Sequence, residues 1–161
     1  MNKQVLYIEK LESKTLLSMV PNDPLLIYQK GLDAIHCAGA WKSSVGSQKI
    51  VVAILDSGVD LTHNDLKNNL WKNPGEIPND GIDNEGDGYV DDVYGWNFAN
   101  NNNDVQDRYG HGTHVAGIVG AEGNNSVGVA GVNWNVSLMI LKFMDDRGVG
   151  NTGGAIQALD Y

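Results

Sequence analysis

Hydrophobic residues in this chain of 161 residues gather in short runs that are separated by long polar stretches. Two continuous apolar runs, 50–55 and 136–144, have the length and composition of strands that are covered on both faces of a sheet. The other predicted elements are helices over 25–44 and 111–121, a strand near 94–98, and a helix capped by Thr152.

This alternation of apolar strands and helices predicts an α/β fold with a mostly parallel sheet. Ligands of such sheets bind beyond the carboxyl ends of the strands. Asp56 directly follows the run 50–55, and His111 opens the helix predicted over 111–121. The two side chains are therefore expected at the same edge of the sheet. The length of the chain and the absence of a linker favour a single domain.

Composition excludes several classes of protein. With 42% hydrophobic and 19% charged residues, the chain has the balance of a globular protein, and no apolar run is long enough to span a membrane. Its first residues contain too short an apolar core for a signal peptide, so any export signal would lie outside this chain. Cys37 is the single cysteine, which excludes an intrachain disulfide and a cysteine-based zinc site.

The net charge of −9 comes from one segment. Between Lys72 and Arg108 the chain has nine acidic residues and no basic one, whereas the acidic and basic residues elsewhere balance. This distribution argues against nucleic acid as a partner, because phosphates require a basic surface. An acidic segment of this kind is either a solvated loop or a cation site.

Within the acidic segment, carboxylates alternate along the chain and a glycine follows, as at the start of an EF-hand-like calcium loop. Tyr94 stands where such a loop carries its bidentate glutamate. The sequence therefore predicts a calcium site without a complete EF-hand, and a solvated acidic loop remains the alternative. The candidate ligands are Asp83, Glu85, Asp87 and Asp92.

The segment 109–117 places His111 between two glycines and ahead of a run of small residues. A carboxylate such as Asp56 can accept a hydrogen bond from one ring nitrogen and leave the other free to take a proton from a hydroxyl nucleophile. Gly110 and Gly112 allow backbone and substrate to approach closely, and Gly117 allows the helix to pack tightly on the sheet. Taken separately, Asp56 is equally compatible with an Asx turn, and His111 with a capping or surface role.

A metal site is a competing interpretation of the histidines. His111 and His114 share a helix face at a spacing of three, and His63 could join them. The segment lacks the glutamate and the spacing of a metalloprotease helix, which disfavours this interpretation.

Together, the blocks 50–60 and 109–117 resemble the aspartate and histidine blocks of the subtilisin-like serine proteases, or subtilases. The resemblance implies a three-layer subtilisin-like α/β fold with a mostly parallel central sheet, of which residues 21–161 would form the N-terminal half. Residues 1–20 resemble the tail of the family's inhibitory propeptide. By the same resemblance, Asp56 and His111 are the catalytic aspartate and histidine, and Gly148, Val149 and Gly150 bind the substrate backbone.

The family's nucleophile block does not occur in this sequence. None of the eight serines lies in the Gly-Thr-Ser context, and the asparagine that donates to the oxyanion is likewise not found. The resemblance therefore implies a secreted or cell-envelope endopeptidase that acts on polypeptides and requires the remainder of the catalytic domain. We expect the 161-residue chain alone to be inactive. The alternative is a non-catalytic calcium-binding remnant or pseudoprotease domain.

The resemblance implies a second calcium site, between the start of the domain and the loop that follows the histidine helix. A simple Asn-Gly turn is the alternative interpretation of that loop. The side-chain ligands would be Asp23, Asp65 and Asn125, and the carbonyl ligands Gly123, Val127 and Val129.

Overall fold

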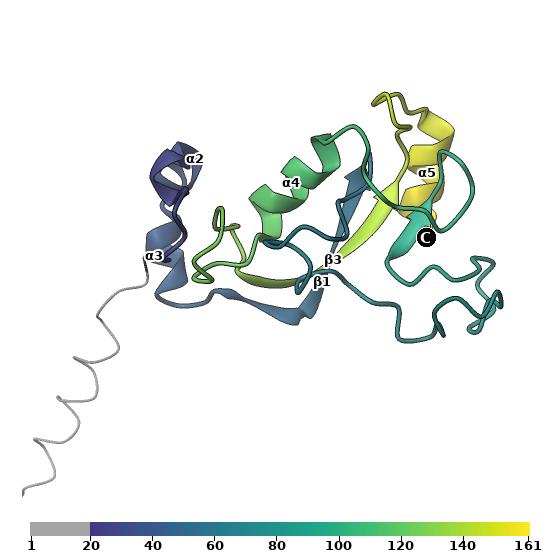
Figure 1. Cartoon of the computed structure of the whole chain (residues 1–161), viewed down its shortest axis with the longest axis horizontal. Coiled ribbons are helices and arrows are strands. Elements are labelled where there is room, and N and C mark those ends of the chain that lie inside the picture. Colours follow the sequence, from purple (N-terminus) through teal and green to yellow (C-terminus); the bar gives the residue numbers. More distant parts are fainter. Residues whose placement is uncertain (1–19) are drawn as a thin grey trace, which may run out of the picture.

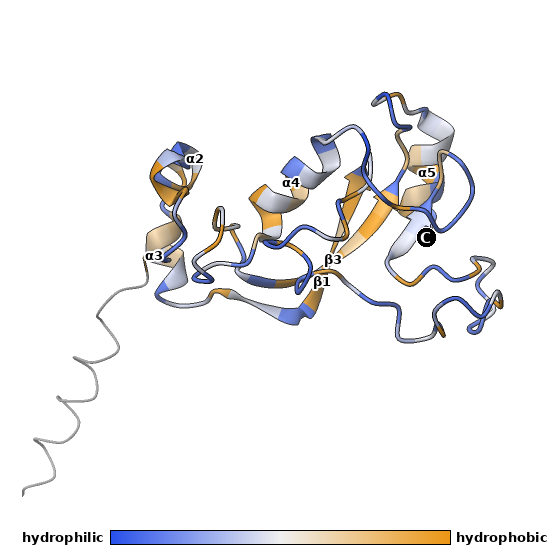
Figure 2. Cartoon of the chain, viewed as in Figure 1, coloured by the Kyte–Doolittle hydropathy of each residue, from blue (hydrophilic) through white to orange (hydrophobic). Residues whose placement is uncertain are grey.

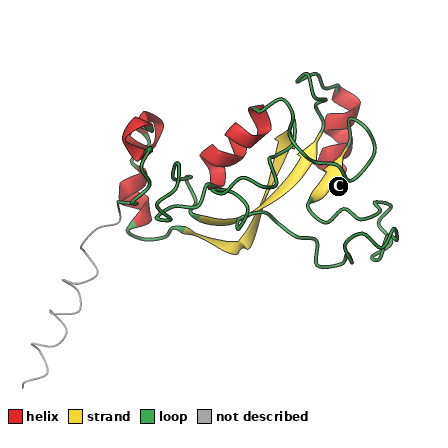
Figure 3. Cartoon of the chain, viewed as in Figure 1, coloured by secondary structure: helices red, strands yellow, loops and turns green. Residues whose placement is uncertain are grey.

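A computed structural model describes residues 20–161, and nearly all of the expected propeptide tail lies outside these residues. Three strands form one parallel sheet in the order β1-β3-β2 (Figures 1 and 3). They span β1 (Gly46–Asp56), β2 (Gly95–Asn97) and β3 (Asn135–Lys142). The predicted α/β fold with a parallel sheet is thereby confirmed.

The register of the sheet places three polar residues side by side at its carboxyl edge. Lys142, the last residue of β3, pairs with Asp56 on one side and with Asn97 on the other. Each of the three is the final residue of its strand, and all three are buried. The edge that parallel α/β sheets use for ligands is thus built from charged and amide side chains.

Helix α4 (His111–Gly120) packs on one face of the sheet. The inward residues of β3 alternate along the strand, as expected for a strand with one face on a core. Figure 2 shows hydrophobic residues concentrated on these strands, whereas the long loop between β1 and β2 is largely polar. The core beneath α4 contains Ile54, Val59, Leu66, Leu70, Val105, Ala116, Ala121, Val136, Leu138 and Ile140.

The expectation that β1 is covered on both faces is wrong for its first half. Ile50 is 60% exposed and Val51 is 46% exposed. Among residues 20–161, β1 pairs with β3 alone and forms an edge of the sheet. Ile50 lies on the same face as Val52 and Ile54, but of these three only Val52 and Ile54 belong to the core beneath α4, and Val51 lies on the opposite face.

The single helix predicted over 25–44 is three short helices. These are η1 (Leu26–Tyr28), α2 (Lys30–Ala34) and α3 (Cys37–Trp41). His36 breaks the helical path because its backbone is left-handed, with φ of 58°. The break lets Trp41 turn onto a second core, where its ring centroid lies 5.1 Å from that of Trp134 and its Nε1 donates to the Val132 carbonyl at 2.9 Å.

Helix α5 (Thr152–Asp160) lies with β2 at the opposite end of the molecule from α2 and α3 (Figure 1). Its cap is Asn151 rather than Thr152, because the Asn151 side chain accepts the Gly154 N–H at 2.9 Å. No helix within residues 20–161 has the length and apolar character needed to cross a membrane.

Candidate functional site

Asp56 and His111 meet at the carboxyl edge of the sheet. The Nδ1 atom of His111 lies 2.8 Å from each carboxylate oxygen of Asp56, although 55 positions separate the residues. The side chain of Asp56 is only 7% exposed, whereas that of His111 is 54% exposed. A buried carboxylate therefore holds one side of an imidazole ring that is otherwise open to solvent.

The close approach depends on glycines where α4 begins. Gly58, with φ of 106°, turns the chain after β1, and Gly112 packs directly against it. A Cβ on Gly112 would overlap the Gly58 carbonyl oxygen and lie 3.1 Å from the Cβ of Asp56. Gly117, which we expected to pack on the sheet, has no atom within 4 Å of an added Cβ; Gly120 makes that contact, against side chains of β3.

This geometry can fix the tautomer of His111. A proton on Nδ1 is shared with the Asp56 carboxylate, which leaves Nε2 as a hydrogen-bond acceptor. The Ser57 N–H donates to Oδ1 of Asp56 at 2.7 Å and helps to hold the carboxylate in place. The arrangement is that of a general base with an orienting carboxylate.

A second carboxylate, the half-buried Asp107, lies beside this pair and was not predicted from the sequence. It accepts hydrogen bonds from the Ser57 hydroxyl at 2.9 Å, from the backbone of Tyr109 and Gly110, and from both the N–H and the hydroxyl of Thr113. Burial opposes the ionisation of Asp107, but these hydrogen bonds outweigh burial and lower its pKa. Asp107 lies four positions before the first residue of α4, whose N-cap is Gly110, so it does not match the usual N-cap signal of a sequence.

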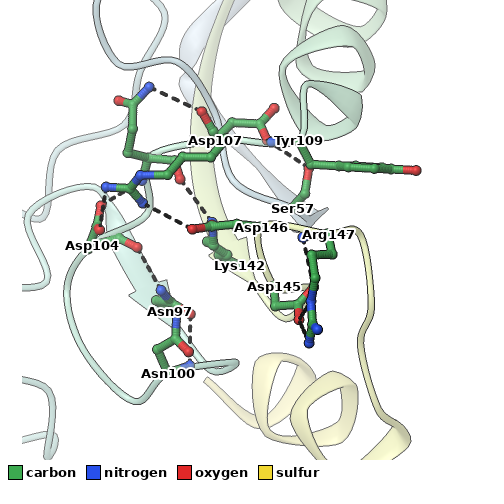
Figure 4. A network of polar contacts seen from close by, with 12 residues as sticks. Ser57, Asn97, Asn100, Asp104, Asp107, Tyr109, Lys142, Asp145, Asp146 and Arg147 are labelled. Carbon is green, nitrogen blue, oxygen red and sulfur yellow. Dashed lines mark hydrogen bonds and ion pairs between the residues drawn. The ribbon is translucent and has the colours of Figure 1, made fainter.

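Lys142 lies between Asp56 and Asn97 at the carboxyl edge of the sheet, and its role was not predicted from the sequence. Its side chain is fully buried, and Nζ donates to the Gln106 carbonyl at 2.9 Å and to Oδ1 of Asp146 at 2.7 Å (Figure 4). Arg108 extends the network at the surface through Asp104 at 2.9 Å and Asp146 at 3.9 Å. A lysine that ends an apolar strand gives no sequence signal that it will be buried.

The expected substrate-binding segment lies next to the loop that precedes His111. A Cβ on Gly148 would lie 2.6 Å from the ring of Tyr109, so the two loops are in contact. Val149 is exposed, but its N–H donates to the Asp145 carboxylate and its carbonyl accepts the Asp145 N–H at 2.8 Å. Among the described hydrogen bonds, the Gly148 carbonyl and both backbone groups of Gly150 remain without partners.

The acidic segment folds into a cluster of carboxylates. Glu85 brings its oxygens within 4.8 Å of those of Asp87 and Asp92, and likewise of those of Asp83 and Glu76. All four predicted ligands are therefore brought into two overlapping groups. Glu76 is an addition that lies outside the alternating pattern used to find the others.

Asp92 is the most deeply buried member of the cluster, and Glu76 is the other buried one. Asp92 is fully buried and accepts hydrogen bonds from Tyr161 and Asn73. Burial raises the pKa of Asp92 in spite of these two hydrogen bonds, and the charges of Asp87 and Glu85 raise it further. Several carboxylates facing one another around a buried one form the oxygen-rich environment that suits a hard divalent cation.

The predicted ligands of the second calcium site also converge. The Asp65 carboxylate, which is 1% exposed, accepts from the Asn125 amide and from the Val129 N–H at 2.8 Å each. The Asp23 carboxylate accepts the Asn124 N–H at 2.7 Å, which ties the start of the domain to this loop. Within the described hydrogen bonds, the carbonyls of the remaining candidates, Gly123, Val127 and Val129, accept none.

The structure does not support a metal site at the histidines. Within residues 20–161, the groups of side chains arranged to hold a metal contain carboxylates only. His63 and His114 instead line a largely apolar groove of about 840 Å³ between α2 and α4.

A family model and individual relatives both match this chain, and they point to the same protein family. The model of the subtilase family matches residues 47–161. Subtilisin-like protease 1 of Plasmodium berghei (strain Anka) is 42% identical over 145 residues, which cover 87% of this chain and 24% of that protein. The halolysin-like extracellular serine protease Nep of Natrialba magadii is 30% identical over 145 residues, which cover 88% of this chain and 24% of that protein.

A solved structure agrees with these relatives. The structure described as proteases from Pseudoalteromonas arctica PAMC 21717 is 33% identical, with a TM-score of 0.61 over 86% of this chain and 43% of that one. The chain spans about a quarter of the length of the two curated relatives, at 24% each.

Proposed function

We propose, since this chain belongs to the subtilase family of serine proteases, that Asp56 and His111 are the orienting carboxylate and the general base of an endopeptidase. One observation carries the proposal. Nδ1 of His111 lies 2.8 Å from both oxygens of a buried carboxylate, while the ring itself stays half-exposed.

In this mechanism, neutral His111 donates a hydrogen bond from its Nδ1–H to Asp56, keeps that proton, and accepts a second proton from a serine hydroxyl at Nε2. The hydroxyl oxygen then attacks the peptide carbonyl carbon, and the imidazolium later returns the proton to the leaving amine. Asp56 remains ionised throughout and stabilises the imidazolium. Loss of the equivalent carboxylate in a triad lowers kcat by about 10⁴-fold.

We propose that the nucleophile comes from the remainder of the catalytic domain. Ser57 is next to the pair, but it is fully buried and its hydroxyl donates to Asp107. A polypeptide substrate could not reach that hydroxyl without unfolding the turn after β1. The 161-residue chain by itself is therefore expected not to hydrolyse peptides.

The substrate in this proposal is an extended polypeptide that lies along Gly148, Val149 and Gly150. The Gly148 carbonyl and the backbone groups of Gly150 would pair with it, because the peptide groups of Val149 already pair with Asp145. The contact between Gly148 and Tyr109 supports this assignment, since it keeps the segment close to the loop that carries His111.

We further propose two structural calcium sites. Asp83, Glu85, Asp87 and Asp92 would hold one ion, with Glu76 as an added carboxylate, and the buried charge of Asp92 would be neutralised on binding. Asp23, Asp65 and Asn125, with the carbonyls of Gly123, Val127 and Val129, would hold the other. There the ion would join the start of the domain to the loop after α4.

We place the whole protein outside the cytoplasm, secreted or in the cell envelope. The support is a relative whose name describes an extracellular protease.

Fluorophosphonate labelling of the full-length gene product tests the catalytic proposal. We expect one labelled serine, with labelling lost in His111→Ala and strongly reduced in Asp56→Asn. His114→Ala is the control from the same helix and should label normally. A folded full-length protein that takes no label would instead support the non-catalytic, calcium-binding alternative. Peptide turnover by the 161-residue chain that His111→Ala abolishes would contradict an external nucleophile.

A further inference from the structure

We infer that Asp107 is a positioning residue that sets the geometry between Asp56 and His111. It does so by joining the turn after β1 to the first turn of α4. The inference rests on the proposed function only in calling the pair catalytic. The positioning of Asp56 and His111 by Asp107 is argued from contacts within the described residues.

One carboxylate accepts five hydrogen bonds, from two separate segments. The donor from the first segment is the Ser57 hydroxyl, and Ser57 immediately follows Asp56. The donors from the second segment are the N–H groups of Tyr109, Gly110 and Thr113 and the Thr113 hydroxyl, which flank His111 on both sides. A shift of Asp107 would therefore move both members of the pair relative to each other.

The two segments are also joined to each other through the groups that Asp107 orients. The Ser57 hydroxyl, which donates to Asp107, accepts the Gly112 N–H at 2.9 Å. The Thr113 hydroxyl, which also donates to Asp107, accepts the Asp60 N–H at 2.9 Å. Each hydroxyl has its proton directed toward Asp107, which leaves its lone pairs for the other segment.

Helix capping alone does not account for this arrangement. A cap needs the side chain to accept N–H groups of the first turn, and the Thr113 N–H satisfies that description. A cap does not need a hydrogen bond from the Ser57 hydroxyl, which belongs to the turn after β1. It also does not need the Gly112 N–H to donate to that hydroxyl. The carboxylate thus serves the junction between the two segments as well as the helix.

Lys142 connects the loop that carries Asp107 to the carboxyl edge of the sheet. Lys142 donates to the Gln106 carbonyl at 2.9 Å, and Lys142 is the register partner of Asp56 in the sheet (Figure 4). The hydrogen bond from Lys142 to Gln106 therefore holds the residue next to Asp107 at the end of the strands, independently of the hydrogen bonds that Asp107 itself accepts. An amide in its place would turn an NH₂ group toward donors and lose part of this set.

The experiment compares the Nδ1–H NMR signal of His111 in the full-length protein and in its Asp107→Asn variant. Asp56→Asn supplies the signal of a ring without its carboxylate, and His111→Gln identifies the resonance. Asp104→Asn is the matched control. It removes a carboxylate charge from the same loop, but that carboxylate pairs with Arg108 at the surface. We expect Asp107→Asn to shift the His111 signal most of the way toward that of Asp56→Asn, and Asp104→Asn to leave it in place.

Ser57→Ala gives an independent variant if Asp107→Asn does not fold, since it removes the hydroxyl link without changing a charge. An unchanged His111 signal in either folded variant would overturn the inference. In the full-length protein, Asp107→Asn should lower kcat by about 10²-fold with little change in KM, as expected for misplaced catalytic groups. Because the NMR signal needs no serine, it can support the positioning role even if the protein proves not to be a peptidase.

Discussion

Gly112 packs against Gly58 so closely that a methyl group on Gly112 would overlap the Gly58 carbonyl oxygen. This contact joins the first turn of α4 to the turn after β1. It therefore sets how near His111 can come to Asp56, and it explains why a glycine is needed directly after the histidine.

Gly112→Ala should accordingly destabilise the fold and separate the pair. Forcing an extra methyl into a packed site costs about 1–3 kcal/mol, because backbone rather than a flexible side chain must move. We expect a lower free energy of unfolding in urea for the 161-residue chain, together with a weakened Nδ1–H signal of His111.

Gly117→Ala is the matched control within the same helix. An added Cβ there meets no atom within 4 Å, and alanine is favoured over glycine in a helix interior by about 0.5–1 kcal/mol. The two substitutions should thus have opposite signs. Equal effects would mean that helix propensity, not the contact with Gly58, decides the outcome at Gly112.

The part of the site that the sequence predicts rests on local signals. Asp56 follows an apolar run and His111 opens a glycine-flanked helix, so the rule for carboxyl edges of parallel sheets brings them together. The alternating carboxylates of the acidic segment are a signal of the same kind, and the structure gathers them into one cluster.

What the sequence does not predict depends on contacts between distant segments. Lys142 ends an apolar strand, and its buried ammonium group is satisfied by the Gln106 carbonyl and by Asp146, both of which lie in loops outside that strand. His36 adopts a left-handed backbone conformation, which breaks the helix predicted over 25–44. No glycine or proline directly beside His36 indicates this break in the sequence. The exposure of Ile50 likewise depends on what packs against β1, not on the apolar run itself.

Stability at acid pH should report on Asp107. Its folded pKa is lowered, so its hydrogen bonds contribute stability above the unfolded pKa of about 3.9, and that contribution is lost as pH falls through the folded pKa. The free energy of unfolding of the natural chain should exceed that of Asp107→Asn from pH 5 to 7, and the difference should shrink below about pH 4. A difference that stays constant down to pH 2 would show that the charge of Asp107 is not what the hydrogen bonds require.

Calcium should stabilise the chain through two separable sites. Glu85 belongs to both carboxylate groups of the acidic cluster, so Glu85→Gln should abolish one binding event in calorimetry. Asp65→Asn should abolish the other. An ion present at 100 times its Kd raises the free energy of unfolding by about 2.7 kcal/mol. Asp33→Asn changes an exposed carboxylate on α2, outside both sites, and should bind calcium as the natural chain does. A loss of binding in Asp33→Asn as large as in Glu85→Gln would indicate nonspecific charge attraction.

Lys142 and Asp146 should respond unequally to substitution, because one is buried and the other is not. The Lys142 side chain is 0% exposed, whereas that of Asp146 is 46% exposed. Asp146→Asn leaves a buried ammonium without its counter-ion, which is the more damaging way to break such a pair. Lys142→Met keeps the volume, leaves Asp146 to water, and removes one hydrogen bond from the Gln106 carbonyl, a loss of about 1–3 kcal/mol.

We therefore expect Asp146→Asn to lower the free energy of unfolding at least as much as Lys142→Met. The double variant should be more stable than Asp146→Asn alone, because it removes the buried charge together with its partner. A double-mutant cycle in urea measures this coupling. Strictly additive losses would mean that the buried ammonium is satisfied by the Gln106 carbonyl alone, and that Asp146 contributes only to the surface pair with Arg108.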